Sequence, residues 1–213
     1  MHNEIEYRED CGMWWPKFDR KPLSTQHAVK SGIGAVEVLV SFCKRLDTCV
    51  QAGGHMGFWP IKLAKTFKHV HTFEADPIIH KCLELNVEKY IGTGHDPKRN
   101  VYVKHKALGD SDKPVLMRRS SSAGGTRVKE GGTLQIPQIT IDSLNLDLCD
   151  AIILDIEAYE PAALRGAAKT IQKFKPVILV EELPRVAVEI AGLLTSWGYR
   201  RQVKYGRDGI WRI

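Results

Sequence analysis

The stretch TCVQAGGHMGFWPIKLAKTF, residues 48–67, decides the fold class of this chain. Residues 48–52 form a short apolar run of the kind found in buried strands, and residues 58–67 have the apolar spacing of a helix. Three glycines lie between them, where the chain has to turn sharply. A strand, a glycine turn and a helix in this order are typical of the first unit of an α/β domain that binds a nucleotide or a cofactor.

Strand and helix patterns continue to alternate after this unit. Residues 77–90 begin with a proline, which suits a first helical turn, and residues 150–156 and 176–182 are apolar runs typical of buried parallel strands. The order predicts a doubly wound, Rossmann-like α/β fold with a seven-stranded, mostly parallel sheet and an antiparallel C-terminal hairpin. The other predicted elements are a helix at 27–46, strands at 70–74 and 100–108, helices at 161–173 and 185–197, and the hairpin at 199–213.

Two segments lie outside this alternation. Residues 1–25 are expected to be an irregular polar lead with an aromatic cluster, CGMWWPKF. With the helix after it, this lead forms a segment, 1–47, that packs on the cofactor-binding domain at 48–213, so that the chain is one globular domain overall. The sequence KPVLMRRSSSAGGTRV at 113–128 predicts an inserted hairpin, whose small-residue tip at 120–125 is expected to be mobile and to become ordered when substrate binds.

The composition excludes several classes of protein. With 43% apolar residues among 213, the chain can bury a normal core. No apolar run approaches the roughly 20 residues of a membrane span, and the polar start MHNEIEYRED is unlike a secretory signal. The five cysteines are scattered and form no CxxC pair, which favours reduced thiols in the cytoplasm over a disulfide framework or a zinc site.

The formal net charge of +6 is unevenly distributed. Residues 98–129 hold nine Lys or Arg against two Asp, and residues 199–213 hold five against one, whereas residues 142–189 hold nine acids against five bases. Solvated faces of an ordinary protein would account for this pattern. The alternative is a basic rim that attracts an anionic partner, with nucleic acid among the candidates.

The glycine turn and a later acid together indicate a nucleoside-containing cofactor. Gly53, Gly54 and Gly57 let a ligand approach the backbone, and Glu74 ends the next predicted strand, where a carboxylate can accept hydrogen bonds from two ribose hydroxyls. The glycine spacing differs from the GxGxxG pattern that cradles a pyrophosphate, which disfavours a nicotinamide oxidoreductase. It is closer to the looser turn that holds the methionine part of S-adenosylmethionine.

Several short motifs, in order, resemble the FkbM-type methyltransferases, a branch of the class I S-adenosylmethionine-dependent enzymes. The resemblance covers roughly residues 48–182. Its main block is ILDIEAYEPAALRGAAKTIQKFKPVILVEE at 153–182, and it is supported upstream by FEADP at 73–77, ALGD at 107–110 and ITIDSL at 139–144. The chain departs from the family at the first motif, where Gln51 stands for an acid and His55 for an asparagine. It also has Ala158-Tyr159 in place of Gly-Ala, and Leu154 in place of lysine.

The resemblance implies class I methyltransferase architecture and S-adenosylmethionine as the cofactor. It implies that Glu74 takes the ribose hydroxyls, with Ala75 and Asp76 beside the adenine and Leu108 and Gly109 along its edge. The methionine part would lie on the turn formed by Ala52, Gly53, Gly54 and Gly57, with Gln51 or His55 at its polar end. Asp155, at the end of a strand, would face the sulfonium.

Methyl transfer to a hydroxyl needs alignment and benefits from a base. Asp155, Glu157, Glu181 and Glu182 come at or after the ends of two adjacent strands, and their clustering would raise one pKa or recruit a cation. We expect Asp155 or Glu157 to be the base, with Glu181 as a third catalytic acid. No metal is predicted, although a divalent metal at these acids is the less favoured alternative. Glu160 is interpreted as an acid that faces a helix dipole.

Weaker candidates surround this site. Trp14 and Trp15 would form a stacking platform over the acceptor or, the favoured interpretation, pack the N-terminal lead onto the domain. Three arginines of the insertion would clamp an anionic acceptor or lie on a solvated hairpin: Arg118, Arg119 and Arg127. His69 and His71 lack a third ligand and are interpreted as structural or solvated.

The sequence therefore predicts an S-adenosylmethionine-dependent methyltransferase that modifies a hydroxyl of a sugar, a small metabolite or a nucleic-acid-linked acceptor. The alternative is a catalytically inactive Rossmann-like protein that binds a nucleoside ligand, or nucleic acid through its basic rim. No membrane partner is expected.

Overall fold

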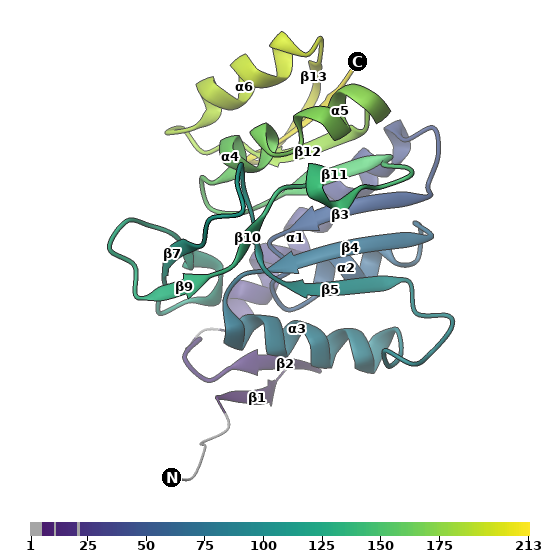
Figure 1. Ribbon diagram of the computed structural model, residues 1–213. Helices are drawn as coiled ribbons and strands as arrows, with labels where there is room; N and C mark the ends of the chain where they lie inside the picture. The colour runs from purple at the N-terminus through teal and green to yellow at the C-terminus, as the bar shows by residue number, and fades with distance from the viewer. Residues whose placement is uncertain (1–5, 11, 21) are drawn as a thin grey trace.

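The computed structural model describes residues 6–10, 12–20 and 22–213, with side chains of the first helix described from residue 32 on. A seven-stranded sheet runs through its centre in the order β13-β14-β12-β11-β3-β4-β5 (Figure 1). Strands β12, β11, β3, β4 and β5 are parallel, and β14 is antiparallel to both of its neighbours. The strands are β3 (Thr48–Ala52), β4 (His69–Glu74), β5 (Val101–His105), β11 (Ala151–Leu154), β12 (Val177–Glu181), β13 (Arg200–Tyr205) and β14 (Asp208–Arg212). The doubly wound sheet with its antiparallel C-terminal hairpin confirms the predicted fold.

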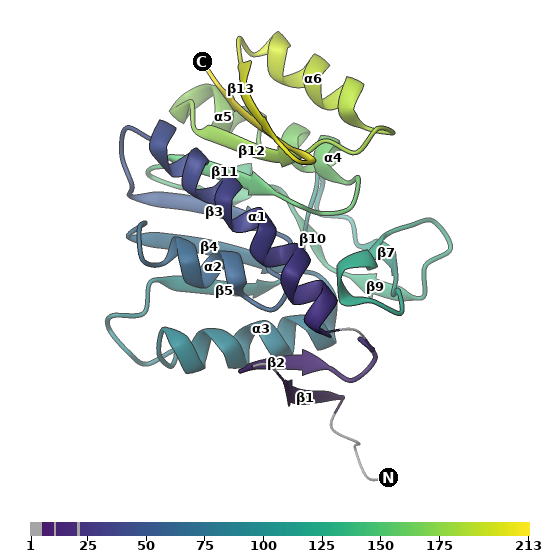
Figure 2. The same ribbon diagram turned by 180° about the vertical axis from the view of Figure 1, so that it is seen from behind.

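Helices cover both faces of this sheet. Alternate residues of each buried strand point to opposite faces, so that Val50 and Ile152 lie in one apolar cluster while Cys49 and Ile153 lie in another. The first cluster packs against α4, α5 and α6, and the second against α1, α2 and α3 (Figure 2). The helices are α1 (Pro22–Phe42), α2 (Phe58–Leu63), α3 (Pro77–Tyr90), α4 (Glu160–Arg165), α5 (Ala168–Phe174) and α6 (Ala187–Ser196). In the described part of the chain, no helix has the length and apolar character to cross a bilayer.

The N-terminal lead is a β-hairpin, so the predicted irregular segment is wrong for its described residues. Strands β1 (Tyr7–Asp10) and β2 (Met13–Pro16) pair antiparallel and lie beside α3. The side chain of Asn86 fixes them there, because it accepts a hydrogen bond from Trp14 N at 2.7 Å and donates one to Trp14 O at 3.0 Å. Cys11 and residues 1–5 lie outside the described residues. Helix α1 begins five residues and ends four residues earlier than predicted. Its start is favoured by Pro22, since proline suits a first helical turn.

The insertion is larger than a hairpin. Strand β7 (Val115–Arg118) pairs with β8 (Arg127–Val128), as predicted, but also with β9 (Leu134–Ile136) on its other edge. Two short strands, β6 (Ala107–Leu108) and β10 (Gln138–Ile139), join it to the domain as a parallel pair. The tip expected to be mobile contains the 3₁₀ turn η1 (Ala123–Gly125) and is packed, because Ala123 is buried against Met13 and Trp15.

Two predicted elements are interrupted. The helix predicted at 161–173 breaks between α4 and α5, where a Cβ on Gly166 would lie 1.9 Å from Gly109 O and Gly166 O accepts a hydrogen bond from Asp142 N at the start of η2 (Asp142–Leu144). The strand predicted at 100–108 ends at His105, because β6 leaves the central sheet to pair with β10. Both interruptions depend on contacts with segments that are distant in sequence.

Candidate functional site

The glycine turn closes tightly around the end of β3. Gly53 has φ +83°, and a Cβ on it would lie 1.9 Å from Asp155 O at the end of the neighbouring strand β11. The amides of Gly53 and Gly54 both donate to Phe73 O, at 3.0 and 2.9 Å. Only glycine can hold this conformation at such close approach. The turn therefore joins the carboxyl ends of three strands: β3, β4 and β11.

Gln51 lies beneath this turn and not on it. Its side chain is fully buried, its Nε2 donates to Gly53 O at 2.8 Å, and its Oε1 accepts a hydrogen bond from the Thr72 hydroxyl. An acid at this position could not donate to Gly53 O. Gln51 thus supports the turn from inside the sheet.

Glu74 forms the polar floor of the adjacent pocket. Its carboxylate accepts hydrogen bonds from His55 N and Asp76 N, both at 2.9 Å. Burial raises the pKa of Glu74 to about 7, even though these backbone hydrogen bonds act to lower it. The carboxylate ties the glycine turn to the end of β4 and keeps lone pairs for further donors.

His55 contributes a neutral ring to the same wall. Its φ of +49° places it in the left-handed region, and its ring contacts Trp15 edge-on at 6.1 Å between centroids. Burial lowers the pKa of His55 to about 4, so the ring is uncharged at neutral pH. Both ring nitrogens are buried and lack a hydrogen-bond partner among the described residues. Such unsatisfied groups call for a polar ligand or ordered water.

Three carboxylates cluster beyond the ends of β11 and β12. Oxygen atoms of Asp155, Glu157 and Glu181 all lie within 4.8 Å of one another. Burial, and then the charge of Glu181, raises the pKa of Asp155 well above its ordinary value. Burial, and then the Glu157 and Glu160 carboxylates, raises the pKa of Glu181 to about 7. Burial and mutual repulsion therefore disfavour the ionised forms of the carboxyl groups in this cluster.

Two other acids near the cluster are structural. Glu160 is fully buried, and its Oε1 accepts from Ile156 N at 2.9 Å and Ala158 N at 3.2 Å, which fixes the loop that carries Glu157. Glu182 accepts from Arg201 at 2.8 Å and from the Trp211 indole at 2.9 Å. Neither side chain lines the pocket described next.

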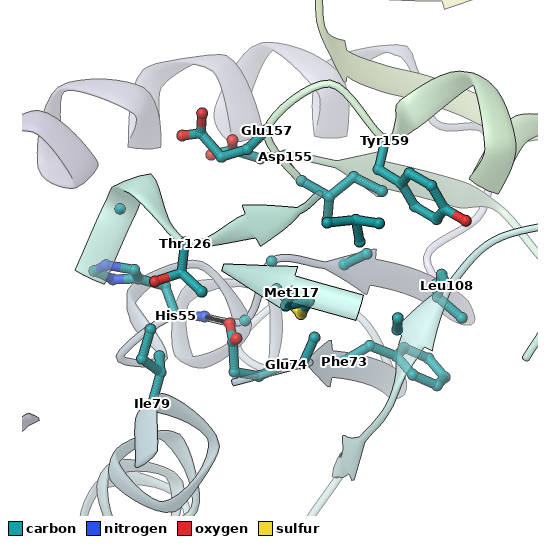
Figure 3. A pocket seen from close by; sticks show the side chains of 18 of the residues that line it. His55, Phe73, Glu74, Ile79, Leu108, Met117, Thr126, Asp155, Glu157 and Tyr159 are labelled. Carbon is teal, nitrogen blue, oxygen red and sulfur yellow. Dashed lines mark hydrogen bonds between the residues drawn. The ribbon is translucent and has the colours of Figure 1, made fainter. Parts of the chain in front are cut away.

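One pocket of about 920 Å³, including its open mouth, unites these features. In Figure 3, Asp155 and Glu157 lie on one side of it, and His55 and Glu74 on the other. Phe73 and Leu108 give it an apolar end, with Tyr159 nearby, where a flat ring can pack. The predicted residues that line it are Ala52, Gly53, Gly54, His55, Glu74, Ala75, Leu108, Asp155 and Glu157.

Other predicted residues lie outside the lining. Gln51, Gly57, Gly109 and Glu181 are close to it in sequence or space without forming its wall. Asp76 caps α3, since it accepts from Ile78 N at 2.8 Å and Ile79 N at 3.2 Å. Of the residues suggested to bind the acceptor, Trp14, Trp15, Arg118, Arg119 and Arg127, none lines the pocket.

The tryptophans and Arg119 instead hold the walls in place. Trp15 is fully buried beside His55. Arg119 binds Asp76 through two hydrogen bonds, Nε–Oδ2 at 2.6 Å and Nη2–Oδ1 at 3.1 Å, and lies 5.1 Å over the ring of Phe18. These contacts dock the insertion on the start of α3.

Sequence patterns missed the part of the wall that the insertion supplies. Met117, Ala123, Gly124, Thr126 and Val128 line the pocket, and they come from β7, η1 and β8 and the residues beside them. The one local signal is the run of small residues at 120–125. Such a run allows another segment to approach closely, but it does not identify that segment. Phe58, Trp59, Phe73, Ile79, Lys106, Ala107, Ile156 and Tyr159 complete the lining.

The geometry suits a ligand that combines a sugar, a flat ring and a polar end. A carboxylate with free lone pairs, a neutral imidazole and apolar walls meet at the carboxyl ends of parallel strands, where such folds bind their ligands. The acid cluster stands at the opposite side, where it can accept a proton or hold a cation.

Known proteins resemble the chain in sequence and in fold. A family profile described as Methyltransferase FkbM domain matches residues 51–201. The solved structure of methyltransferase FkbM from Methylobacillus flagellatus KT superposes with a TM-score of 0.56 at 18% identity, over 79% of this chain and 44% of that chain. This superposition confirms the class I methyltransferase architecture. The chain spans less than half the length of that protein.

Two further solved structures are similar at lower scores. Precorrin 8w decarboxylase from Methanobacterium thermoautotrophicum matches with a TM-score of 0.49 at 15% identity, over 84% of this chain and 86% of that one. Precorrin-6y C5,15-methyltransferase from Geobacter metallireducens GS-15 matches with a TM-score of 0.49 at 12% identity, over 84% of each chain. Curated proteins provide no match to the chain.

Proposed function

Since the chain belongs to the FkbM methyltransferase domain family, we propose that it is an enzyme that methylates a hydroxyl oxygen of a sugar, a small metabolite or a nucleic-acid-linked acceptor. Members of this family take the methyl group from S-adenosylmethionine. The observation that supports the proposal is the single pocket that joins the glycine turn, Glu74 and the carboxylates Asp155 and Glu157.

The residues of the pocket fit this cofactor. Glu74 can accept from both ribose hydroxyls while it keeps its two backbone donors. Phe73 and Leu108 offer an apolar slot for adenine. His55, with two buried and unpartnered ring nitrogens, offers one donor and one acceptor to a polar group. The turn at Gly53 and Gly54 lets the remaining part of the cofactor approach the backbone.

When bound, S-adenosylmethionine supplies an activated methyl group whose transfer to a hydroxyl oxygen leaves S-adenosylhomocysteine and one proton. Asp155 and Glu157 lie in the pocket wall, where they can orient the acceptor and take that proton. Glu160 fixes the loop between them and α4, which keeps Glu157 in position. The insertion residues Ala123 and Thr126 close one side of the pocket against water.

The test is a methylation assay on the full chain with labelled S-adenosylmethionine and a panel of hydroxyl, amine and nucleic-acid acceptors. We expect transfer to a hydroxyl, with a methyl ether identified by NMR of the product. Asp155→Asn should abolish turnover while S-adenosylhomocysteine still binds in calorimetry. Transfer only to nitrogen would overturn the assignment to oxygen, and bound cofactor without turnover on any acceptor would favour the inactive alternative.

An anionic acceptor is the second candidate, and the exposed Arg118 and Arg127 of the insertion favour it. Binding of an oligonucleotide that weakens steeply with salt would support it. We also propose a cytoplasmic location, which is supported by the four described cysteines, Cys43, Cys49, Cys82 and Cys149, all of which are free thiols.

A further inference from the structure

We infer that Asp155, Glu157 and Glu181 form a binding site for one hard divalent cation of the Mg²⁺, Mn²⁺ or Ca²⁺ type. The site lies at the carboxyl ends of β11 and β12, where Asp155 and Glu157 line the pocket and Glu181 lies close to them without lining it. Carboxylate oxygens are the ligands that such ions prefer.

The spacing of the three carboxylates matches a shared ion. Their oxygen atoms lie within 4.8 Å of one another. Two oxygens on opposite sides of one ion are separated by twice the metal–oxygen distance. This oxygen–oxygen separation is about 4.2 Å for Mg²⁺ and about 4.6–5.2 Å for Ca²⁺. Because 4.8 Å is the upper limit for each pair of oxygens, small side-chain rotations would bring one oxygen of each residue to a shared ion.

Glu181 provides an independent indication that a ligand is needed. Its residue is only 6% exposed, and its Oε2 is buried with no hydrogen-bond partner in the described part of the chain. Its Oε1 has a single ion pair, at 3.7 Å, with the exposed side chain of Arg207. A buried anionic oxygen without a donor is costly, and a cation bound between the three carboxylates would remove that cost.

Other buried acids of the molecule have the donors that Glu181 lacks. Asp76 accepts from two amides and from Arg119. Asp150 accepts from two amides and from Arg45, and Glu182 accepts from Arg201 and Trp211. These three buried carboxylates are compensated by donors, whereas Glu181 and its neighbour Glu160 each keep one buried oxygen without a partner among the described residues.

Positive side chains near the cluster do not replace the ion. Arg185, Arg127 and Arg207 lie close enough to Glu157 to influence its charge, but the hydrogen bond described for Arg185 is to the Glu157 backbone oxygen, at 3.1 Å. Asp208 and Glu160 add further negative charge near Asp155. The centre of the cluster is therefore negative on several sides, and within the described part of the chain the ion pair found there is the 3.7 Å contact between Arg207 and Glu181.

A cation at this site would also take part in the proposed methyl transfer, and this role rests on the proposed function. Its position beside Asp155 and Glu157 would allow an acceptor hydroxyl to complete the coordination, and a bound divalent ion makes such a hydroxyl easier to deprotonate. The proton would leave through a carboxylate of the cluster to solvent.

The binding test uses the full chain freed of metal with EDTA and then titrated with Mn²⁺, followed by the EPR signal of free Mn²⁺ and by calorimetry. We expect one ion per chain, displaced by excess Mg²⁺ or Ca²⁺. Glu181→Gln and, separately, Asp155→Asn should weaken Mn²⁺ binding by at least the roughly 10- to 100-fold typical of residues that only support metal ligands. The matched control Glu88→Gln removes the same charge at an exposed position of α3 and should bind Mn²⁺ as the wild type does.

The outcomes separate the site from the proposed function. No Mn²⁺ binding at about 1 mM, the weak end of protein affinities, would overturn the site, as would wild-type affinity in both variants. Methylation of hydroxyls that continues in EDTA, together with Mn²⁺ binding, would overturn only the role in acceptor activation. Mn²⁺ binding without methylation of any acceptor would leave the site standing and remove the proposed function.

Discussion

At the scale of single residues, the polar edge of the pocket depends on the contact between Glu74 and His55. The Glu74 carboxylate holds the His55 amide at 2.9 Å, and so fixes a residue in the left-handed region that lines the pocket. Burial moves the pKa values of the two side chains in opposite directions, to about 7 for Glu74 and about 4 for His55. Near neutral pH, Glu74 is therefore the group of this pair that titrates.

Cofactor affinity should rise with pH because of Glu74. Hydroxyl donors favour the ionised carboxylate, and a pKa raised to about 7 leaves Glu74 mostly protonated at pH 6 and mostly ionised at pH 8. If only the ionised form binds, the affinity for S-adenosylhomocysteine increases about tenfold between these two values. Calorimetry at both pH values measures it.

Substitution at Glu74 isolates this effect from other groups. Glu74→Gln should bind the cofactor more weakly and with no rise between pH 6 and pH 8. Asp155→Asn should keep the rise, because its carboxylate lies on the other side of the pocket. A wild-type affinity that is flat with pH would contradict the role given to Glu74.

The approach of Gly53 to Asp155 O should make Gly53→Ala severely destabilising. Gly198 has nearly the same φ, +84° against +83°, but open space around it. Gly198→Ala should therefore lower the free energy of unfolding by only about 1–2 kcal/mol, the cost of holding alanine in the left-handed region. Gly53→Ala should lower it further, because the new Cβ clashes with the backbone oxygen of Asp155. Urea unfolding of both variants measures the difference, and equal losses of stability would show that the turn relaxes freely.

At the scale of elements, the inserted sheet of β7, β8 and β9 is docked through one charged contact. Asp76 is fully buried, and its carboxylate caps α3 and also binds Arg119. Because Asp76 also follows Glu74 closely, this contact links the insertion to the floor of the pocket.

Arg119→Ala should loosen the insertion. It removes two hydrogen bonds to a buried carboxylate, which we expect to lower the free energy of unfolding by about 1.5–3 kcal/mol. The exposed neighbour Arg118 is the control, and Arg118→Ala should change stability by no more than about 0.5 kcal/mol. Thermal unfolding measures both, and limited proteolysis should cut the Arg119 variant first within residues 113–136. Equal behaviour of the two variants would contradict the docking role.

Elements that depend on local patterns could be predicted from the sequence, and those that depend on distant contacts could not. Strand β3 and helix α3 have the predicted bounds, because an apolar run and a Pro77 start are local signals. The break at Gly166 was missed, since it depends on Gly109. The hairpin β1–β2 was missed because its partner, Asn86, lies on α3.

The same distinction applies to the site. Gly53, Glu74 and Asp155 could be placed from the sequence, because each follows a recognisable strand and parallel strands end at one edge of the sheet. The inward position of Gln51 and the wall formed by Ala123 and Thr126 could not. Both depend on side-chain packing between segments that no local pattern connects.

At the scale of the whole molecule, the pocket is built from segments that are distant in sequence. The turn at 52–55, the end of β4, the insertion at 117–128 and the loop at 155–159 all contribute to its lining. The N-terminal hairpin supports two of them, because Trp15 and Met13 pack with Ala123 and with Met56 after the turn. A ligand that fills the pocket contacts all four segments, so its binding energy stabilises their mutual arrangement and not one wall alone.

Cofactor binding should therefore protect the insertion together with the glycine turn. With S-adenosylhomocysteine at 100 times its dissociation constant, the free energy of unfolding should rise by about 2.7 kcal/mol. Hydrogen exchange followed by mass spectrometry should slow at 53–55, 123–128 and 155–159 together, while the C-terminal hairpin at 200–212, which supplies no residue to the lining, should change little. In Glu74→Gln at the same ligand concentration, protection should fall in all three segments. Protection restricted to 52–75 would contradict this coupling, because the insertion would then exchange independently of the bound cofactor.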